Sequence, residues 1–466
     1  MSTQWPTVAN MRRRLFVSSI AAGMLAERAS ADGRSAAALA NAAITANDEA
    51  RRAAISALIA RGPETAAALI DLMLYFPDEG DMIAAALRRF SGRTTGTDWH
   101  GWMLWLEEHP SHRSFDGYDA FKIRLLSEID PNFLDFTAAD APRTIRFEEI
   151  VWGGVLKDGI PALVSPQFIA AREADWLWDG ELVFGVEIDG DVRAYPHRIM
   201  DWHEMANDTV GGVPVALAYC TLCGSGVLYE TRIAGRDTPF EFGSSGLLYR
   251  SNKLMYDRQT HSLWNHFTAR PVVGPLVGAG IELKTRPVAV ARWMDWKKRH
   301  PDTRVLSLDT GYRRDYTPGR PYGTYFATPG LMFPTLTTDD RLAPKDIVYV
   351  IRSADGLRAW PMRIFNGGRV LNDTIGSRPI ILIGDGRSET IRAYDRRDLR
   401  FVAAFDGSAA GPLALHDEAG TRWHVGEAEL RADDGRRLPR LAGHNAFWFA
   451  FARFVGEAGS LYREPR

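Results

Sequence analysis

Cysteine is almost absent from this chain: Cys220 and Cys223 are the only two among 466 residues. A metal held by these thiolates would therefore need one or two further ligands of another kind. The sequence also lacks an excess of positive charge, because 56 Lys and Arg face 58 Asp and Glu. This balance argues against nucleic acid as a partner. No apolar run reaches the roughly twenty residues that a membrane-spanning helix needs, so we expect no membrane span once an export signal is removed.

What the chain does have is the length and composition of an ordinary globular protein. Its 466 residues are enough for two or three domains with cores of their own. The apolar fraction of 45% and the charged fraction of 24% are those of soluble proteins. We therefore expect a multidomain protein of the α+β class, with a helical N-terminal domain followed by a β-rich domain.

An export signal is predicted for residues 1–31. From Met11 the chain reads MRRRLFVSSIAAGMLAERASA, a basic cluster followed by a short, mildly apolar stretch and by small residues at a cleavage point. Arg13 and Arg14, with the apolar residues that follow, fit the twin-arginine pattern. These features begin at Met11, which is therefore an alternative start of the chain. We expect a periplasmic or otherwise exported protein, whose two cysteines meet an oxidising compartment.

Residues 32–135 predict a helical domain. Ala, Leu and Ile recur at spacings of three and four in LANAAITANDEARRAAISALIARG, ETAAALIDLMLYF and DMIAAALRRF. Pro63 and Pro77 mark helix ends between these stretches. Short helices with tight turns resemble HEAT-type hairpins. We expect this domain to carry no chemistry and to offer the surface that would hold a protein partner.

From about residue 143 the pattern changes to the two-residue period of strands. VFGVEIDGDVRAYP has the form of two strands around an Asp-Gly turn, and VPVALAYC and GVLYETRI flank the cysteines as further strands. We assign residues 143–310 to a first β-rich repeat and residues 346–466 to a second. Residues 311–345 between them form a long loop rich in Tyr, Pro and Gly, and such a length is typical of a functional cover or a connector.

The two β-rich parts repeat each other at a constant offset. LVFGVEIDGDVRAYPHRIMDWHEMANDTVGGVPVALA matches IVYVIRSADGLRAWPMRIFNGGRVLNDTIGSRPIILI, so that Pro196 is matched with Pro361. Residues that both copies share are expected to be scaffold. In place of His203, Glu204, Cys220 and Cys223, the second copy has Gly368, Arg369, Asp385 and Ser388. Because these residues differ together between the copies, we expect them to act together.

Cys220-Thr-Leu-Cys223-Gly224 has the spacing of a metal knuckle, in which two thiolates bind one ion and the glycine permits a turn with positive φ. We expect His203 as a third ligand, and Glu204 as a fourth ligand or as a group that orients the others. Soft thiolates with an imidazole suit copper or zinc. The expected supporting residues of this site are Asp201, His197, His266, Asp257 and Trp264. Of these, Asp257 and Trp264 have counterparts in the second copy and are expected to be scaffold.

Other interpretations of the cysteines remain open. In an oxidising compartment they would form a reactive disulfide, as in a thiol–disulfide redox protein. Alternatively they form an inert disulfide, or stay as core thiols, in a structural or partner-binding protein. A hydrolase is disfavoured, because neither a nucleophile elbow nor a zincin helix accompanies His203 and Glu204. An enzyme would use the loop after Asp309 as a lid; no residue is assigned a catalytic role.

Four segments carry a specific family resemblance: GGVLKDGIPAL, AYPHRIMDWHEMANDTVGGVPVALAYCTLCGSGVLYE, GLLYRSNKLMYDRQTHSLWNHFTARPVVGPL and GTYFATPGLMFP. They resemble a bacterial and archaeal family, domain of unknown function 3179, from about Arg143 to the C-terminus. The resemblance implies an exported, β-rich protein, and it places the characteristic residues of the family at His203, Glu204, Cys220 and Cys223. It implies no particular activity, substrate or cofactor.

Overall fold

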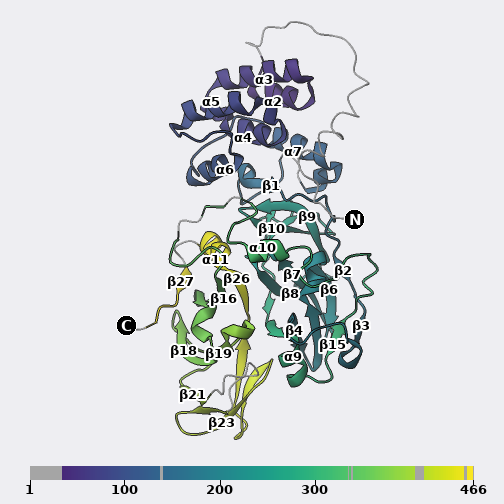
Figure 1. Ribbon diagram of the computed structural model, residues 1–466, viewed down its shortest axis with the longest axis vertical. Coiled ribbons are helices and arrows are strands. Elements are labelled where there is room, and N and C mark those ends of the chain that lie inside the picture. The colour runs from purple at the N-terminus through teal and green to yellow at the C-terminus, as the bar shows by residue number, and fades with distance from the viewer. Residues whose placement is uncertain are drawn as a thin grey trace.

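The computed structural model describes residues 34–136, 140–333, 335–336, 339–404, 414–455 and 459–464. The predicted export signal, residues 1–31, lies outside the described residues. The protein has a helical N-terminal region and a larger β-rich region with several sheets (Figure 1), which agrees with the mixed class expected. Among the helices of the described residues, none combines the length and the apolar character needed to cross a bilayer.

The N-terminal region consists of short helices joined by tight turns: α2 (Ala36–Thr45), α3 (Asp48–Arg61), α4 (Ala66–Tyr75), α5 (Gly80–Ser91), α6 (Trp99–Glu108) and α7 (Tyr118–Ile129). Ser35 and Asn47 begin α2 and α3, because their side chains accept backbone N–H groups of the first turn. Pro63 and Pro77 each start a 3-10 turn that is separated by one residue from the end of a helix, where the sequence predicts helix ends. Helix α4 is buried along almost its whole length and lies at the centre of this core.

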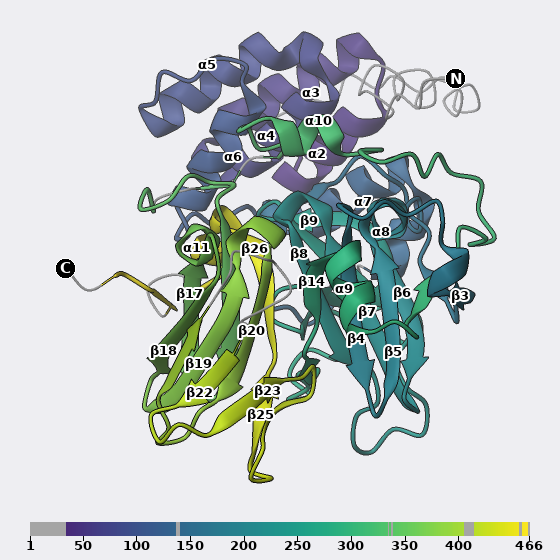
Figure 2. The same cartoon turned by 60° about the horizontal axis from the view of Figure 1, so that its bottom comes forward.

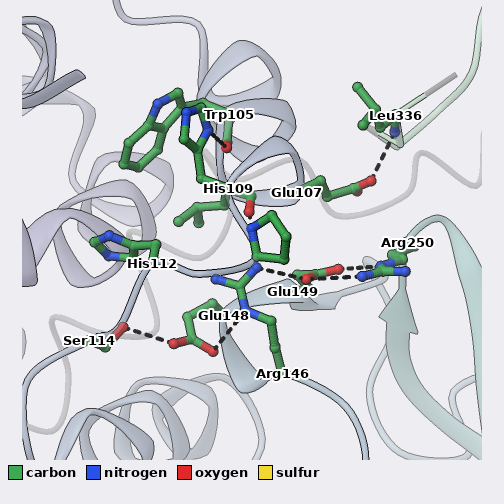
Figure 3. Close-up of polar contacts among 12 residues, drawn as sticks. Trp105, Glu107, His109, His112, Ser114, Arg146, Glu148, Glu149, Arg250 and Leu336 are labelled. Carbon is green, nitrogen blue, oxygen red and sulfur yellow. Dashed lines mark hydrogen bonds and ion pairs between the residues drawn. The ribbon is translucent and has the colours of Figure 1, made fainter. Parts of the chain in front are cut away.

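Charged side chains join the helical region to the β-rich region (Figure 3). Glu149 accepts hydrogen bonds from Arg146 at 3.0 Å and from Arg250 at 3.2 Å. Arg146 also donates to the carbonyl oxygen of Leu106, in α6, at 3.0 Å. Since Arg250 belongs to a turn of the β-rich region, Glu149 connects the two regions.

The first β-rich part contains three five-stranded sheets. The strands and helices used below are β1 (Ile150–Trp152), β3 (Phe168–Ala170), β4 (Leu182–Ile188), β5 (Asp191–Pro196), α8 (His197–His203), β6 (Met205–Val210), β7 (Val213–Cys220), β8 (Ser225–Glu230), β9 (Phe242–Tyr249), β10 (Asn252–Asp257), β11 (Leu263–Asn265), β12 (Arg270–Val273), β14 (Ala289–Arg292), α9 (Trp293–Arg299) and β15 (Arg304–Leu306). One sheet has the order β1-β9-β10-β11-β12, another contains β8-β7-β6, and the third has the order β14-β4-β5-β15-β3. The turn between β4 and β5 has positive φ at Asp189 and Gly190, as the predicted Asp-Gly hairpin requires.

The second β-rich part also begins with an antiparallel hairpin. Its elements used below are β16 (Ile347–Ser353), β17 (Gly356–Pro361), β18 (Arg369–Ile375), β19 (Arg378–Asp385), β20 (Thr390–Asp395), β26 (Gly443–Phe447), α11 (Trp448–Val455) and β27 (Gly459–Leu461). The register Val183↔Pro196 between β4 and β5 reappears as Val348↔Pro361 between β16 and β17. Figure 2 shows the two parts side by side, the first in teal and the second in green and yellow.

An aspartate accepts from an arginine and from an aromatic side chain in each of the two parts. Asp208 accepts from Arg193 and Tyr195, and Asp373 accepts from Arg358 and Trp360 in the equivalent strands. In each part, a tryptophan N–H also donates to an aspartate of a neighbouring strand. These contacts therefore join strands within each part.

Candidate functional site

The two cysteines lie at the tip of the hairpin formed by β7 and β8. Cys220 is the last residue of β7, and a 3-10 turn, Thr221–Cys223, leads to Gly224 and β8. Gly224 adopts the left-handed conformation, with φ of 57°, that the sequence predicts for this turn. A disulfide joins Cys220 to Cys223, and the Cα atoms of these residues are 5.3 Å apart. The two sulfurs are therefore bonded to each other.

A small cavity of about 50 Å³ lies beside this disulfide. Cys220, Glu204, Lys253 and Tyr322 line it together with aliphatic side chains. Cys220 is 2% exposed, whereas Cys223 is completely buried and is not part of the cavity wall. A molecule that enters the cavity would therefore meet Cys220 first.

Glu204 and Lys253 form a buried ion pair in the wall of the same cavity. The ammonium of Lys253 lies 3.2 Å from the carboxylate of Glu204 and donates to its backbone carbonyl at 3.0 Å. The hydroxyl groups of Thr221 and Tyr322 donate to the same carboxylate at 2.6 and 3.2 Å. Burial lowers the pKa of Lys253, and the negative charge of Glu204 opposes this effect. Because Thr221 belongs to the cysteine turn, the carboxylate of the ion pair is hydrogen-bonded to that turn.

Cys223 packs against the turn between β9 and β10. The side-chain amide of Asn252 donates to the sulfur of Cys223 at 3.2 Å, and the carbonyl oxygen of Ser251 lies 3.5 Å from that sulfur. Arg250 and Ser251 both have positive φ, a conformation that costs non-glycine residues about 1 kcal/mol or more. Asn252 Oδ1 and Ser251 Oγ are buried without a partner among the described residues. Polar groups are thus concentrated at the buried sulfur.

The loop expected at residues 311–345 contacts the cysteine turn through Tyr325, one of its described residues. It contains the short helix α10 (Gly323–Ala327). Tyr325 donates its hydroxyl hydrogen to the carbonyl oxygen of Leu222, in the middle of the turn, at 2.7 Å. Tyr322 reaches the carboxylate of Glu204 from the same segment. The loop therefore closes one side of the cavity.

His203 has its hydrogen-bond partners outside the cysteine turn. Its Nδ1 donates to the carbonyl oxygen of Pro161 at 2.8 Å, and its Nε2 accepts from the hydroxyl of Tyr316 at 2.6 Å. Burial lowers the pKa of His203 to about 4, so the ring is neutral at pH 7. Both ring nitrogens are thus occupied, and neither offers a free lone pair to a metal.

The metal site that the sequence predicts is not supported. Within the part of the chain that the structure describes, no group of three or more His, Cys, Asp or Glu side chains is placed to hold an ion. The cysteines bond to each other, His203 binds Pro161 and Tyr316, and Glu204 pairs with Lys253. The four expected ligands are therefore engaged by different partners.

The expected supporting residues also have separate places. His266 donates from Nε2 to a backbone carbonyl of β7 at 2.9 Å. Trp264 donates to Asp257 at 2.8 Å, so these two belong to the framework. His197 stacks on a phenylalanine of β4, with ring centroids 4.1 Å apart, and lines a different cavity. None of these contacts reaches the cysteine sulfurs.

Asp201 is buried close to the ion pair, and its protonation affects the stability of the protein. Burial, and next the charge of Glu204, raise the pKa of Asp201 well above its usual value. Its Oδ1 has no partner among the described residues. The folded protein therefore holds a proton that the unfolded chain releases above about pH 4, so the free energy of unfolding falls as the pH rises.

We predict that Asp201→Asn stabilises the protein more at about pH 8 than at about pH 4. The expected gain over the wild type is roughly 1.4 kcal/mol for each pH unit between the unfolded and folded pKa values. Urea unfolding at both pH values measures this gain in unfolding free energy. The control is Asp302→Asn, at an exposed position. A gain that is the same at both pH values would show that Asp201 does not titrate in this way.

Sequence reasoning missed Lys253, Asn252 and Thr221. All three are buried polar residues that contact Glu204 or Cys223. The available signal was Asn252-Lys253 at the start of a buried strand, because such residues are rarely buried without a partner. Their partners lie far along the chain, so the pattern does not identify them.

Comparison with known proteins gives a family and no function. A family model described as a protein of unknown function, DUF3179, matches residues 157–458. No curated protein and no solved structure matches the chain. The matched range contains every candidate site residue discussed above.

Proposed function

The chain belongs to the DUF3179 family of proteins of unknown function, and we propose that it is a thiol–disulfide redox protein whose active pair is Cys220 and Cys223. The proposal depends on one comparison within the molecule. In the second β-rich part, Asp385 and Ser388 occupy the positions of the cysteines, and the same 3-10 turn forms there. Asp385 stabilises this turn by accepting the backbone N–H of Arg387 at 2.9 Å.

This comparison favours a chemical role for the disulfide over a structural one. The turn in the second part ends in the same left-handed conformation, with φ of 56° at Glu389 against 57° at Gly224. The backbone therefore forms this turn without a disulfide. A disulfide across four residues also restricts the unfolded chain very little. Stability alone gives no reason for two cysteines in the first part.

The surroundings of the sulfurs support one order for the exchange. A substrate thiolate that enters the cavity attacks Cys220 Sγ, the S–S bond breaks, and Cys223 leaves as a thiolate. The amide hydrogen bond from Asn252 stabilises this leaving group. A second substrate thiolate then attacks the substrate sulfur of the mixed disulfide and releases Cys220. Two substrate thiols are oxidised to one disulfide, and Cys220 and Cys223 take up the two electrons and the two protons.

The ion pair of Glu204 and Lys253 would support the reduced form. Lys253 supplies a positive charge in the wall of the cavity that Cys220 also lines. A nearby cation favours a thiolate over a thiol. Glu204 pairs with Lys253 and accepts a hydrogen bond from Thr221 of the cysteine turn. We infer that the loop carrying Tyr322 narrows the entrance of the cavity, so that only small or extended thiol substrates reach Cys220.

We place this chemistry outside the cytoplasm, where the predicted twin-arginine signal would deliver the folded protein with its disulfide. We also infer that the two β-rich parts arose by duplication, and that only the first carries the redox pair. We further propose that the N-terminal helices pack as HEAT-like hairpins and that they hold a protein partner. Copper or zinc binding by the reduced pair is the rival function, and the experiment below includes it.

The test is to purify the full chain from a periplasmic fraction and to count its free thiols and bound metal. We expect no free thiols in the folded protein, and two that appear together when it is equilibrated in glutathione buffers. A structural disulfide would stay oxidised there, since such disulfides have potentials below about −300 mV. One copper or zinc ion per chain with free thiols would establish the rival function. The control is the double variant Cys220→Ser/Cys223→Ser, which has neither a reducible disulfide nor thiols that bind metal.

A further inference from the structure

A second cavity, of about 390 Å³, lies between the two β-rich parts. Gly224, the residue after Cys223, lines it, whereas Cys220 lines the first cavity. Leu182 and Ile347, which occupy equivalent positions in the two parts, both line it. Its volume is within the range of about 300–1,000 Å³ that is usual for small-molecule sites. No step of the proposed redox chemistry uses this cavity.

Aromatic side chains form much of its wall. Phe184 stacks on His197 with ring centroids 4.1 Å apart, and Phe326 lies 6.4 Å from Phe447. The first pair comes from the first β-rich part, and Phe447 comes from β26 of the second. Rings that face a cavity from two sides favour a flat or branched apolar group between them.

Two opposite charges line the same cavity without pairing to each other. The carboxylate of Glu389 has no hydrogen bond or ion pair with any described residue, and burial raises its pKa while the charge of Arg292 lowers it. Lys345 donates to the carbonyl oxygens of Tyr325 and Thr328 at 2.6 and 2.8 Å, and it forms no ion pair with a described carboxylate. Its ammonium also lies 3.3 Å from the centroid of the Tyr325 ring, so two carbonyl groups and a ring hold the positive charge and no described carboxylate neutralises it.

A neutral polar group in the wall of the same cavity has no hydrogen-bond partner among the described residues. Nε2 of His197 is buried without a hydrogen bond to any described residue. Burial lowers the pKa of His197 to about 3, so the ring is neutral at pH 7. An unpaired ring nitrogen in an aromatic wall costs free energy, which a ligand with a polar hydrogen or a lone pair would recover.

We propose that this cavity binds a small zwitterion, an α-amino acid with an apolar or aromatic side chain. Its ammonium group pairs with Glu389, its carboxylate pairs with Lys345, and its side chain lies between the aromatic rings. A plain amine would be repelled by Lys345 and a plain carboxylate by Glu389. Only a ligand with both charges satisfies both residues. This proposal does not depend on the redox activity of the cysteines.

The experiment is isothermal titration calorimetry of the full chain with three probes. L-Phenylalanine carries both charges, 2-phenylethylamine carries only the ammonium, and 3-phenylpropanoate carries only the carboxylate. We expect L-phenylalanine to bind about tenfold or more tightly than either of the others. No heat from any probe, or a single-charge probe that binds as tightly as L-phenylalanine, would overturn the proposal.

Two variants locate the binding to this cavity. Glu389→Gln should weaken the binding of L-phenylalanine by about tenfold or more, because it removes the negative charge that pairs with the ammonium group. Phe326→Ala, at a ring that is 40% exposed, should weaken it several-fold and leave the fold intact. Glu418→Gln, in an exposed ion pair with Arg400, is the matched control. Unchanged affinity in both cavity variants would overturn the assignment, and retained binding in Cys220→Ser/Cys223→Ser would support its independence from the redox site.

Discussion

The variant Cys223→Ser is expected to accumulate as a stable mixed disulfide when it is mixed with oxidised glutathione. The Cys220 thiolate attacks one sulfur of that disulfide, binds one glutathione, and releases the other as a thiol. In the wild type, Cys223 then displaces the bound glutathione and restores the internal disulfide. Serine does not perform this step, so we expect about tenfold or more adduct than in the reduced wild type. Intact-mass spectrometry measures the adduct.

The partner variant Cys220→Ser is the matched control. It keeps Cys223, which is completely buried against Ser251 and Asn252. Because a thiol reacts only where a reagent reaches it, we expect this variant to react about 100-fold more slowly in the folded protein. Equal rates for the two variants would contradict the order of attack assigned above. Failure of both to react while folded would make the disulfide structural.

The variant Glu204→Gln is expected to lose about 3–5 kcal/mol of unfolding free energy. Lys253 is 4% exposed and has Glu204 as its charged partner. Removal of one member of a buried ion pair leaves the other charge without compensation, which costs far more than the pair itself contributes. Urea unfolding monitored by tryptophan fluorescence measures the change.

A double-mutant cycle tests the physical reason. Lys253→Met removes the charge that Glu204→Gln leaves uncompensated, so the double variant should be clearly more stable than the sum of the single changes predicts. The exposed pair of Arg400 and Glu418 provides the control, and Glu418→Gln there should change stability by about 1 kcal/mol or less. Additive losses at Glu204 and Lys253 would show that the two charges do not depend on each other.

Local features of this protein were predictable because neighbouring residues determine them. The ends of α3 and α4 follow from Pro63 and Pro77, since proline lacks the N–H that continues a helix. The β4–β5 hairpin follows from Asp189 and Gly190, because both residues tolerate positive φ. The strands around the cysteines follow from alternating apolar residues.

The candidate site was predicted only in part, because its contacts join distant segments. Nearness along the chain suggested that His203 would meet the cysteines, but Tyr316, 113 residues away, occupies its ring nitrogen. Glu204 was expected near a metal, whereas a lysine 49 residues further along pairs with its charge. No local pattern encodes such distances.

The sequence by itself determined the spacing of the two cysteines and the position of the glycine that ends their turn. It also showed that other residues replace both cysteines in the second β-rich part. These properties depend on residue identity and on spacings of a few residues. The tertiary structure alone decided that Cys220 faces a cavity while Cys223 is buried against Asn252. It also brought Lys253 to Glu204. The reason is physical: burial and charge compensation depend on which strands pack together, and that packing joins residues tens of positions apart.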